Sequence, residues 1–562
     1  MTARAGPALA APATVWLLAT FAAPFGVVIL LSLHQDADPF APLFTQPSTA
    51  QFRAILTDSF YIRVILETLA LGAGVTLLAV VLGYPVALWL ARMPVRWRPI
   101  ALAVILIPLL TNVVVRSLGI VLLLAPDGLI NQVLGVFGLG PIRGMLYTHG
   151  AVALGLVQIF MPFVVLALCG VLQGTSPRMH EAAQSLGASP AVRFWTVDFP
   201  LSLPGLRAGV MIVFLVSSTA YVSATLLGGK KVWTTGMLVW EEALQNLNAP
   251  TASALALIMT ACSIGFIAAC GFAFARLMPW LDGRPAEAWS LPARLVRALD
   301  LVAPAVYRSL LAVALALLLL PLVLVCIQGF NDVPQATVAG FRAFTWRWYE
   351  AVLFGGAYVD AFRLSIEIAV VSATVALGLA MPAAFALVRH RFTGLTVLAA
   401  IWALPLSLPQ VAIGVGMLRL LQLYTVVPPF LGIVAVHVVL ILPFTIALLQ
   451  ASVQQLDRAQ EEAATTLGAG ALRRFAFVIV PGLAPGLAAT GIIAFLLSFG
   501  EVTVTSFVTT ARTITLPVRI YAEASFSLEP TVHEVSTLLI IVTIVALFAL
   551  NRAVRLDRLY AR

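Results

Sequence analysis

The sequence predicts an all-α membrane protein with about twelve transmembrane helices, arranged as two parallel six-helix repeats. Hydrophobic residues make up 61% of the 562-residue chain and charged residues 10%, whereas soluble domains are nearer half and a quarter. Apolar runs of about 20 residues, the length that crosses roughly 30 Å of hydrocarbon, recur along the whole chain. Prolines and polar motifs also recur at fixed spacings, which indicates a tandem duplication.

The apolar runs place twelve spans. They lie at 12–33, 63–91, 99–124, 149–172, 205–227, 251–276, 307–328, 361–388, 394–421, 430–451, 483–508 and 531–550. The first run is longer than the apolar core of a signal peptide, and no convincing cleavage site follows it. We therefore expect it to be retained as a span.

Basic and acidic segments alternate between the spans. The segments 92–98, 389–391 and 552–562 are rich in arginine and fall on one side, whereas Asp127 and Asp332 fall on the other. The positive-inside rule then places both termini in the cytoplasm. Because the arginines form short blocks beside apolar spans, the net charge of +9 indicates membrane orientation and not a nucleic-acid partner.

The positions of the four cysteines do not indicate a disulfide or a metal site. Cys169, Cys262, Cys270 and Cys326 lie in apolar runs without CxxC spacing. This pattern is typical of small buried hydrophobic residues, so we expect no disulfide, metal site or cofactor.

The duplication defines the domains. The pairs 297 residues apart are Pro85 and Pro382, Arg92 and Arg389, and Pro108 and Pro405, and the pairs 281 residues apart are Pro162 and Pro443, and Pro204 and Pro485. The difference of 16 residues gives the first repeat a longer outer loop, at about 125–147. We predict a first domain at 1–277, a cytoplasmic linker at 278–305 and a second domain at 306–562, related by an axis along the membrane normal.

Two polar loops, 177–200 and 457–481, have closely similar sequences. In each, a Glu-Ala-Ala triplet is followed by Gly six residues after the Glu and by Pro nineteen residues after it. The residues concerned are Glu181, Ala182, Ala183, Gly187 and Pro200 in the first loop, and Glu462, Ala463, Ala464, Gly468 and Pro481 in the second. A loop that only joins two spans has no physical reason to keep this spacing twice. We therefore predict that both loops lie in the cytoplasm and dock into a motor protein.

Each loop is predicted to contain a short amphipathic helix. The apolar positions of the first helix are Met179, Ala182, Ala183 and Leu186. Ser176 and Asp457 suit the helix starts, and Gly187 and Gly468 supply the left-handed turn that ends each helix. The alternative is a helix lying on lipid, but lipid favours bulkier apolar residues and no fixed spacing.

These motifs resemble the membrane permease subunits of ATP-binding-cassette (ABC) importers of the type I fold, whose cytoplasmic signature is EAA, three residues, Gly, nine residues, then an apolar residue and Pro. Val197 and Val478 complete the match. The resemblance implies a bacterial inner-membrane subunit in which each loop is a coupling helix seated in an ATPase. It also implies two fused permease domains, two copies of an ABC ATPase subunit and a periplasmic solute-binding protein.

Within that family the chain looks most like the spermidine/putrescine permeases. The matching stretches are 111–117, 128–132 and 226–229 in the first half, and 330–332, 346–350 and 516–521 in the second. Permeases for ferric iron, thiamine, opines and 2-aminoethylphosphonate share much of this pattern and stay open as alternatives. One departure weakens the polyamine interpretation, because Ala220 occupies the position whose second-half counterpart is the acidic Glu501.

Ionisable residues at membrane depth are candidates for the substrate pathway. Arg116 and Glu501 are the best candidates, with a structural contact between spans as the alternative. Glu67 and Glu367 lie near span ends and are expected to reach the interface. His437 is expected to be a satisfied core residue.

The energy source must be a separate subunit. The sequence 228–231 (GlyGlyLysLys) lacks the first Gly and the Ser or Thr of a phosphate loop, and no Walker motif exists in the chain. We therefore expect no enzymatic activity in this chain. The rival from another class is an ion-coupled secondary transporter, which would need paired carboxylates or ion sites in the bundle.

Overall fold

The computed structural model describes residues 5–35, 47–174, 176–278, 293–336, 339–423, 427–526 and 529–554. These residues are helical almost throughout, and the single strand-type pairing among them is an isolated bridge between Asn331 and Phe344. The predicted all-α class is confirmed. Residues 279–292 of the predicted linker and residues 555–562 of the basic tail lie outside the described residues, and α15 begins at Ala293, inside the predicted linker.

The helices of the first half are α1 (Ala5–Leu17), α2 (Ala23–Ser32), α3 (Ala50–Thr57), α4 (Ser59–Arg92), α5 (Arg98–Leu110), α6 (Val113–Leu124), α7 (Leu129–Val136), α8 (His149–Gln173), α9 (Pro177–Ser185), α10 (Pro190–Arg193), α11 (Phe199–Ser218), α12 (Val222–Gly228), α13 (Thr235–Leu244) and α14 (Ala249–Leu277). Those of the second half are α15 (Ala293–Gln328), α16 (Arg347–Phe354), α17 (Gly356–Arg389), α18 (Leu395–Ser407), α19 (Gln410–Leu423), α20 (Pro429–Gln455), α21 (Arg458–Thr466), α22 (Ala471–Arg474), α23 (Val480–Phe499), α24 (Thr505–Val508), α25 (Leu516–Phe526) and α26 (Thr531–Val554). π-helical turns at Leu18–Ala22, Phe194–Asp198 and Phe475–Ile479 join α1 to α2, α10 to α11 and α22 to α23.

Within the described residues, eleven helices are long and apolar enough to cross a membrane, or twelve if the bent pair α18 and α19 is one span. The expected continuous spans at 99–124 and 394–421 are each two helices, and α18 and α19 meet at 92°. In the first half a new helix starts because the Asn112 side chain accepts a hydrogen bond from the Val114 amide at 2.7 Å. In the second half Pro409, which has no amide hydrogen, precedes α19.

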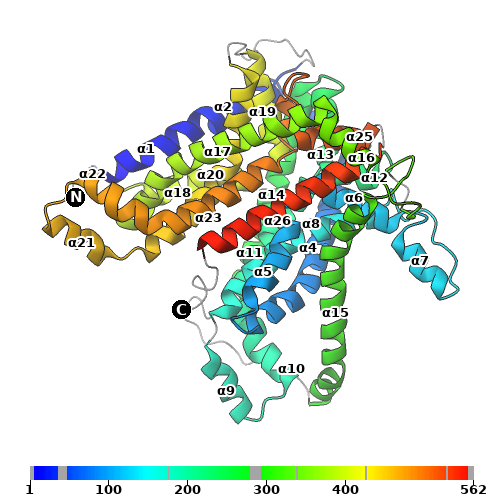
Figure 1. Cartoon of the computed structure of the whole chain (residues 1–562), viewed down its shortest axis with the longest axis horizontal. Coiled ribbons are helices and arrows are strands. Elements are labelled where there is room, and N and C mark those ends of the chain that lie inside the picture. Colours follow the sequence, from blue (N-terminus) through cyan, green and yellow to red (C-terminus); the bar gives the residue numbers. More distant parts are fainter. Residues whose placement is uncertain are drawn as a thin grey trace.

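The first helices of the two halves are exchanged. In Figure 1, α1 lies along α17 in the arm formed by the second half, and α15 lies beside α4 and α6 of the first half. A Cβ atom at Gly119 of α6 would lie 2.3 Å from the carbonyl oxygen of Pro321 in α15. A Cβ atom at Gly416 of α19 would lie 2.4 Å from the carbonyl oxygen of Pro24 in α2. Gly416 lies 297 residues after Gly119, and Pro321 lies 297 residues after Pro24. The crossing is therefore present twice, once in each half.

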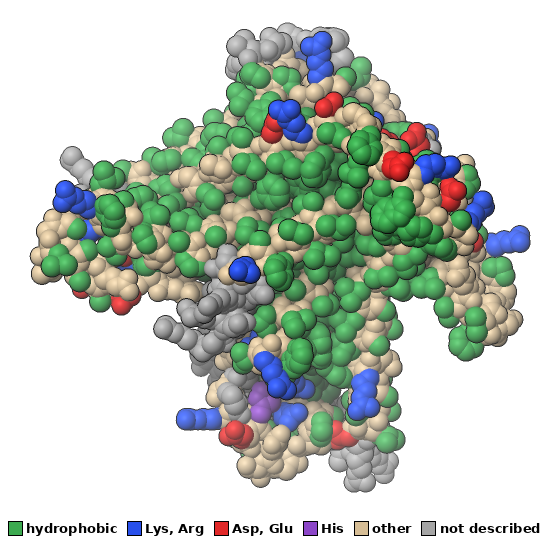
Figure 2. Space-filling model, viewed as in Figure 1, with side chains coloured by type: hydrophobic (Ala, Val, Ile, Leu, Met, Phe, Trp, Pro, Cys, Tyr) green, Lys and Arg blue, Asp and Glu red, His purple; other side chains and the backbone are tan. Residues whose placement is uncertain are grey.

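The two halves diverge from a common end. Figure 1 shows one arm with α17, α20 and α23 and a second arm with α4, α8 and α11, which meet near α13, α25 and α12. Figure 2 shows hydrophobic side chains over the helices, whereas charged side chains gather at the two arm tips and at the common end. This distribution is the one expected for a bundle with an apolar belt. The polar loops with α9 and α21 form the two tips.

Candidate coupling site

Both predicted loop helices are present, as α9 and α21. Ser176 occupies the N-cap position of α9, with Pro177 as the first helical residue, but the Ser176 side chain makes no capping bond. Asp457 caps α21, because its carboxylate accepts a hydrogen bond from the Ala459 amide at 2.9 Å. A second short helix, α10, follows Ser189 in the first loop.

Both helices end at the predicted glycines. Gly187 has φ of 75° and Gly468 has φ of 81°, a left-handed conformation that side chains with a Cβ rarely adopt. Beyond each glycine the next amide closes the turn: Ala188 donates to the carbonyl of Ala183 at 3.0 Å, and Ala469 donates to that of Ala464 at 3.0 Å. This is the Schellman pattern, which satisfies carbonyls that have no partner in the helix.

The outer faces of both helices are exposed. Leu186 is 87% exposed and Leu467 is 88% exposed, each directly before the terminating glycine. The side chains of Glu181, Ala182, Glu462 and Ala463 are also exposed, Ala183 is half-buried and Ala464 is buried. Each arm tip therefore presents a leucine and a carboxylate to the surroundings on a short rigid helix.

The prolines of the motif lie where the loop enters the next span. Pro200 and Pro481 are in the first turns of α11 and α23, directly after the π-helical turns. The amide of Phe199 reaches back to the carbonyl of Phe194 and that of Val480 to Phe475, one residue further than in an α-helix. Because proline has no amide hydrogen and its ring crowds the preceding turn, the wider turn accommodates it.

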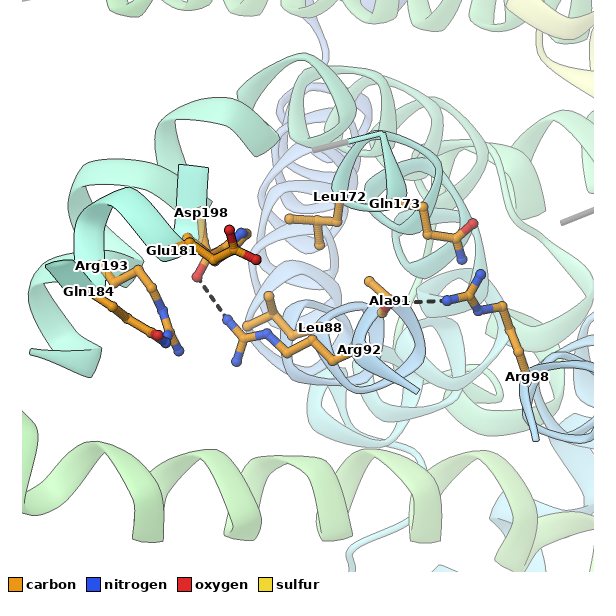
Figure 3. Close-up of a pocket in the computed structure, with 11 residues that line it drawn as sticks. Leu88, Ala91, Arg92, Arg98, Leu172, Gln173, Glu181, Gln184, Arg193 and Asp198 are labelled. Carbon is orange, nitrogen blue, oxygen red and sulfur yellow. Dashed lines mark hydrogen bonds and ion pairs between the residues drawn. The ribbon is translucent and has the colours of Figure 1, made fainter. Parts of the chain in front are cut away.

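In the first repeat a buried carboxylate joins the loop to the end of α4. The Arg92 guanidinium donates to Asp198 Oδ2 at 2.8 Å, and His180 Nε2 lies 2.7 Å from Asp198 Oδ1. The Asp198 side chain is 4% exposed. Figure 3 shows Arg92 reaching Asp198 across a cavity of about 560 Å³ that lies between α4 and the loop.

In the second repeat the arginine at the end of α17 contacts the loop helix α21 itself. The Arg389 guanidinium donates to Glu461 Oε1 of α21 at 2.9 Å and to the carbonyl oxygen of Leu456 at 2.9 Å. The Arg389 side chain is 11% exposed and that of Glu461 is 20% exposed. A cavity of about 750 Å³ lies beside this contact and is lined by residues of α17, α21 and η4, the π-helical turn Phe475–Ile479.

The pathway candidates lie apart from the loops and in polar contacts within the bundle. Arg116 is buried and donates to the carbonyl oxygen of Ile159 in α8 at 3.2 Å. The Glu501 carboxylate accepts from the amides of Val504 and Thr505, both at 2.9 Å, at the start of α24. Both side chains therefore already have structural partners, and their part in a pathway stays a prediction.

The polar core residue expected at position 437 has partners for both ring nitrogens. His437 Nδ1 lies 2.7 Å from Ser498 Oγ, and Nε2 lies 2.8 Å from Thr505 Oγ1. The expectation of a satisfied core histidine is confirmed. No group of three or more His, Cys, Asp or Glu side chains that could hold a metal ion is present in the part of the chain that the structure describes.

A second pair of duplicated contacts at the common end was not anticipated from the sequence. The Tyr61 hydroxyl donates to Glu242 Oε1 at 3.1 Å, and the Tyr358 hydroxyl donates to Glu523. Thr68 Oγ1 accepts from the Thr235 amide at 2.9 Å, and Ser365 Oγ accepts from the Leu516 amide at 2.8 Å. The residues of α4 and their counterparts in α17 are 297 residues apart, and those of α13 and α25 are 281 residues apart. These are the spacings of the sequence repeat, which was therefore the signal in the sequence that could have found the contacts.

The fold and the paired loops define a class: multi-pass membrane proteins built from two repeats. A family model described as the binding-protein-dependent transport system inner membrane component matches residues 376–556. The spermidine/putrescine permease PotB of Haemophilus influenzae is 32% identical over 248 residues, which are 44% of this chain and 85% of that protein. PotC of Escherichia coli is 27% identical over 234 residues, 42% of this chain and 88% of that protein.

A solved bacterial ABC transporter involved in import of the polysaccharide alginate matches 48% of this chain and 94% of its own, with a TM-score of 0.42 and 16% identity. On the sequence matches, the chain belongs to the family of inner-membrane permeases of ABC importers and is similar to the polyamine permeases.

Proposed function

We propose that the chain is the translocation subunit of an ATP-driven importer in a bacterial inner membrane, with both permease domains, 1–277 and 306–562, fused by the linker at 278–305. Two copies of an ABC ATPase subunit bind α9 and α21 from the cytoplasm, where both termini also lie. A periplasmic binding protein delivers the solute to the common end. The chain itself hydrolyses no ATP.

The observation that carries this proposal is the pair of exposed loop helices at separate arm tips (Figure 1). Leu186 and Leu467 are almost fully exposed there, which is costly for an isolated chain but suits a surface that a partner covers. With one ATPase subunit bound at each tip, closure of the ATPase pair on ATP binding can move both arms. ATP binding then draws the tips together and shifts the population between two conformations.

The fused arrangement is supported by the lengths of the relatives. About 44% of this chain covers 85% of PotB, and 42% covers 88% of PotC. One relative therefore corresponds to less than half of this chain. The duplicated Gly–Pro crossings and Tyr–Glu contacts also follow the same spacings of 297 and 281 residues.

For the solute we propose a polyamine-like or other small organic cation. The relatives with polyamine permease names support this class. The common end also carries half-buried carboxylates at Glu241, Glu242 and Glu523, which suit the approach of a cation. Uptake of ferric iron, thiamine, an opine or 2-aminoethylphosphonate instead of putrescine or spermidine by the purified system would contradict this assignment.

Transport into proteoliposomes tests the energy source. We expect uptake of radiolabelled putrescine only when the binding protein is outside and both the ATPase and ATP are inside. Uptake driven by an ion gradient without ATP would favour the secondary transporter. The variant Glu462→Lys reverses the charge of an exposed coupling-helix carboxylate and should uncouple ATP hydrolysis from uptake, and an unchanged ratio of solute to ATP would contradict the docking role.

A further inference from the structure

Each repeat joins its coupling helix to the end of a 34-residue span through an arginine and a carboxylate. α4 and α17 have 34 residues each and end at Arg92 and Arg389, which are 297 residues apart. Arg92 binds Asp198, and Arg389 binds Glu461. The arginine has the same place in both repeats, but the carboxylates do not.

The repeat spacing shows that the acids of the two repeats occupy different positions in the loop. Glu461 lies 281 residues after His180, and Ile479 lies 281 residues after Asp198. The first repeat therefore has a histidine on the coupling helix and an acid beyond it, whereas the second has an acid on the helix and an isoleucine beyond it. In the first repeat His180 reaches the same acid as Arg92, so the helix is still joined to the arginine.

We propose that Arg92 and Arg389 are positioning residues that fix α9 and α21 to α4 and α17, so that displacement of a coupling helix by the ATPase moves the long span with it. This inference rests on the proposed function. The contacts suit the role because the Asp198 and Arg389 side chains are largely buried, at 4% and 11% exposure. A charge-assisted hydrogen bond is stronger than a neutral one and weakens less in salt when it is buried.

The long spans also reach the opposite end of the molecule. A helix of 34 residues extends about 51 Å at 1.5 Å per residue. Near their other ends, Tyr61 and Thr68 of α4 bind α13, and Tyr358 and Ser365 of α17 bind α25. Each span thus has a polar attachment to the coupling helix at one end and to a short helix of the common end at the other.

Exchange of the two arrangements gives a sharp test in the full chain. Asp198→Ile removes the acid of the first repeat and copies Ile479. The double variant His180→Glu, Asp198→Ile recreates the second arrangement, with an acid on α9 facing Arg92. The single variant should lose the attachment of α9, and the double variant should regain it.

Two readouts are measured on the chain in lipid nanodiscs. Hydrogen exchange of the amides in α9 should become roughly tenfold faster or more in Asp198→Ile, the change expected when one charge-assisted hydrogen bond is lost, and should return toward the wild-type rate in the double variant. In the complex, transport per ATP hydrolysed should fall and recover in the same order. Exchange in α21 should not change, because its own attachment is intact.

The second repeat supplies an independent variant in case Asp198→Ile fails to fold. Glu461→Gln removes the charge from a more exposed acid, so the chain should fold, and faster exchange is then expected in α21 and not in α9. The matched control is Glu367→Gln, which removes an exposed ion pair with Arg363 on the same helix α17 and should change neither readout.

The inference is overturned if Asp198→Ile and Glu461→Gln leave exchange and coupling unchanged, or if the double variant is no better than Asp198→Ile. Failure of the proposed function looks different. In that case no ATPase is bound by the wild-type chain, while hydrogen exchange still reports whether the arginines hold the loop helices.

Discussion

Gly119 of α6 packs against the backbone of Pro321 in α15 so closely that a methyl group at Gly119 would lie 2.3 Å from the Pro321 carbonyl oxygen. The same contact joins Gly416 and Pro24, with the roles of the two halves exchanged. Small residues allow the backbones of membrane helices to approach in this way. The two crossings hold the first helix of each half against the other half, and they make the fused chain one interlocked bundle.

The crossings predict that Gly119→Ala and Gly416→Ala destabilise the bundle. The added methyl group would meet backbone atoms, which cannot move aside as a flexible side chain can, and overpacking of this kind costs about 1–3 kcal/mol. Thermal unfolding in detergent should show a lower Tm for both variants. Gly74→Ala is the control, because nothing lies within 4 Å of a Cβ atom at that position of α4. An equal Tm for Gly119→Ala and Gly74→Ala would contradict the close crossing.

The tyrosine–carboxylate contacts predict that Tyr61→Phe loosens α13 and that Tyr358→Phe loosens α25. Each substitution removes a hydrogen bond to a carboxylate, which contributes about 1.5–3 kcal/mol, and leaves the ring in place. Faster hydrogen exchange is expected in residues 235–244 for the first variant and in 516–526 for the second. Tyr147→Phe, at a tyrosine that is 44% exposed, should change neither segment. A uniform effect on both helices would argue against two local contacts.

The terminating glycines predict a purely backbone effect. At Gly468 a Cβ atom would meet no atom within 4 Å, so only the left-handed φ of 81° opposes a side chain. Gly468→Ala should cost about 1 kcal/mol and fray the end of α21, seen as faster exchange of the Ala469 amide. Gly470→Ala is a matched control, because Gly470 also has open space but an ordinary φ of −64°. Similar exchange in the two variants would show that the turn is not strained.

The carboxylate at Glu241 predicts a dependence of stability on pH. Burial in α13, and then the charge of Glu242, raise the pKa of Glu241 above its ordinary value of 4.5. The folded chain therefore holds this proton more tightly than the unfolded chain, and the group's contribution to stability falls as the pH rises through the raised pKa. Glu241→Gln removes this loss.

The measurement is the Tm of wild type and Glu241→Gln at pH 5 and pH 8. The Tm of the variant minus that of wild type should be larger at pH 8 than at pH 5, because only the wild type carries the ionisable Glu241 carboxyl. Titrating groups that do not interact with Glu241 are common to both proteins and cancel in the comparison. The same difference in Tm at both pH values would contradict the shift.

The sequence by itself determined the helical class, the duplication and the two loop helices. Composition and run length fix which segments enter a membrane, and local rules fix where a short helix stops, so Gly187 and Gly468 could be assigned from spacing alone. Nothing in the sequence indicated which arginine meets Asp198 or Glu461. The sequence also predicted two continuous spans where Asn112 and Pro409 begin new helices, because an apolar run carries no record of a bend within it.

Only the tertiary structure decided the contacts between distant segments. The exchange of α1 and α15 between the halves, and the attachment of α4 and α17 at both ends, depend on pairs such as Arg389 with Glu461 that are 72 residues apart. The geometry and the low-dielectric surroundings that strengthen each such contact, and that offset its desolvation cost, exist only after the helices pack. A sequence repeat can mark the positions involved, but it does not say which of them touch.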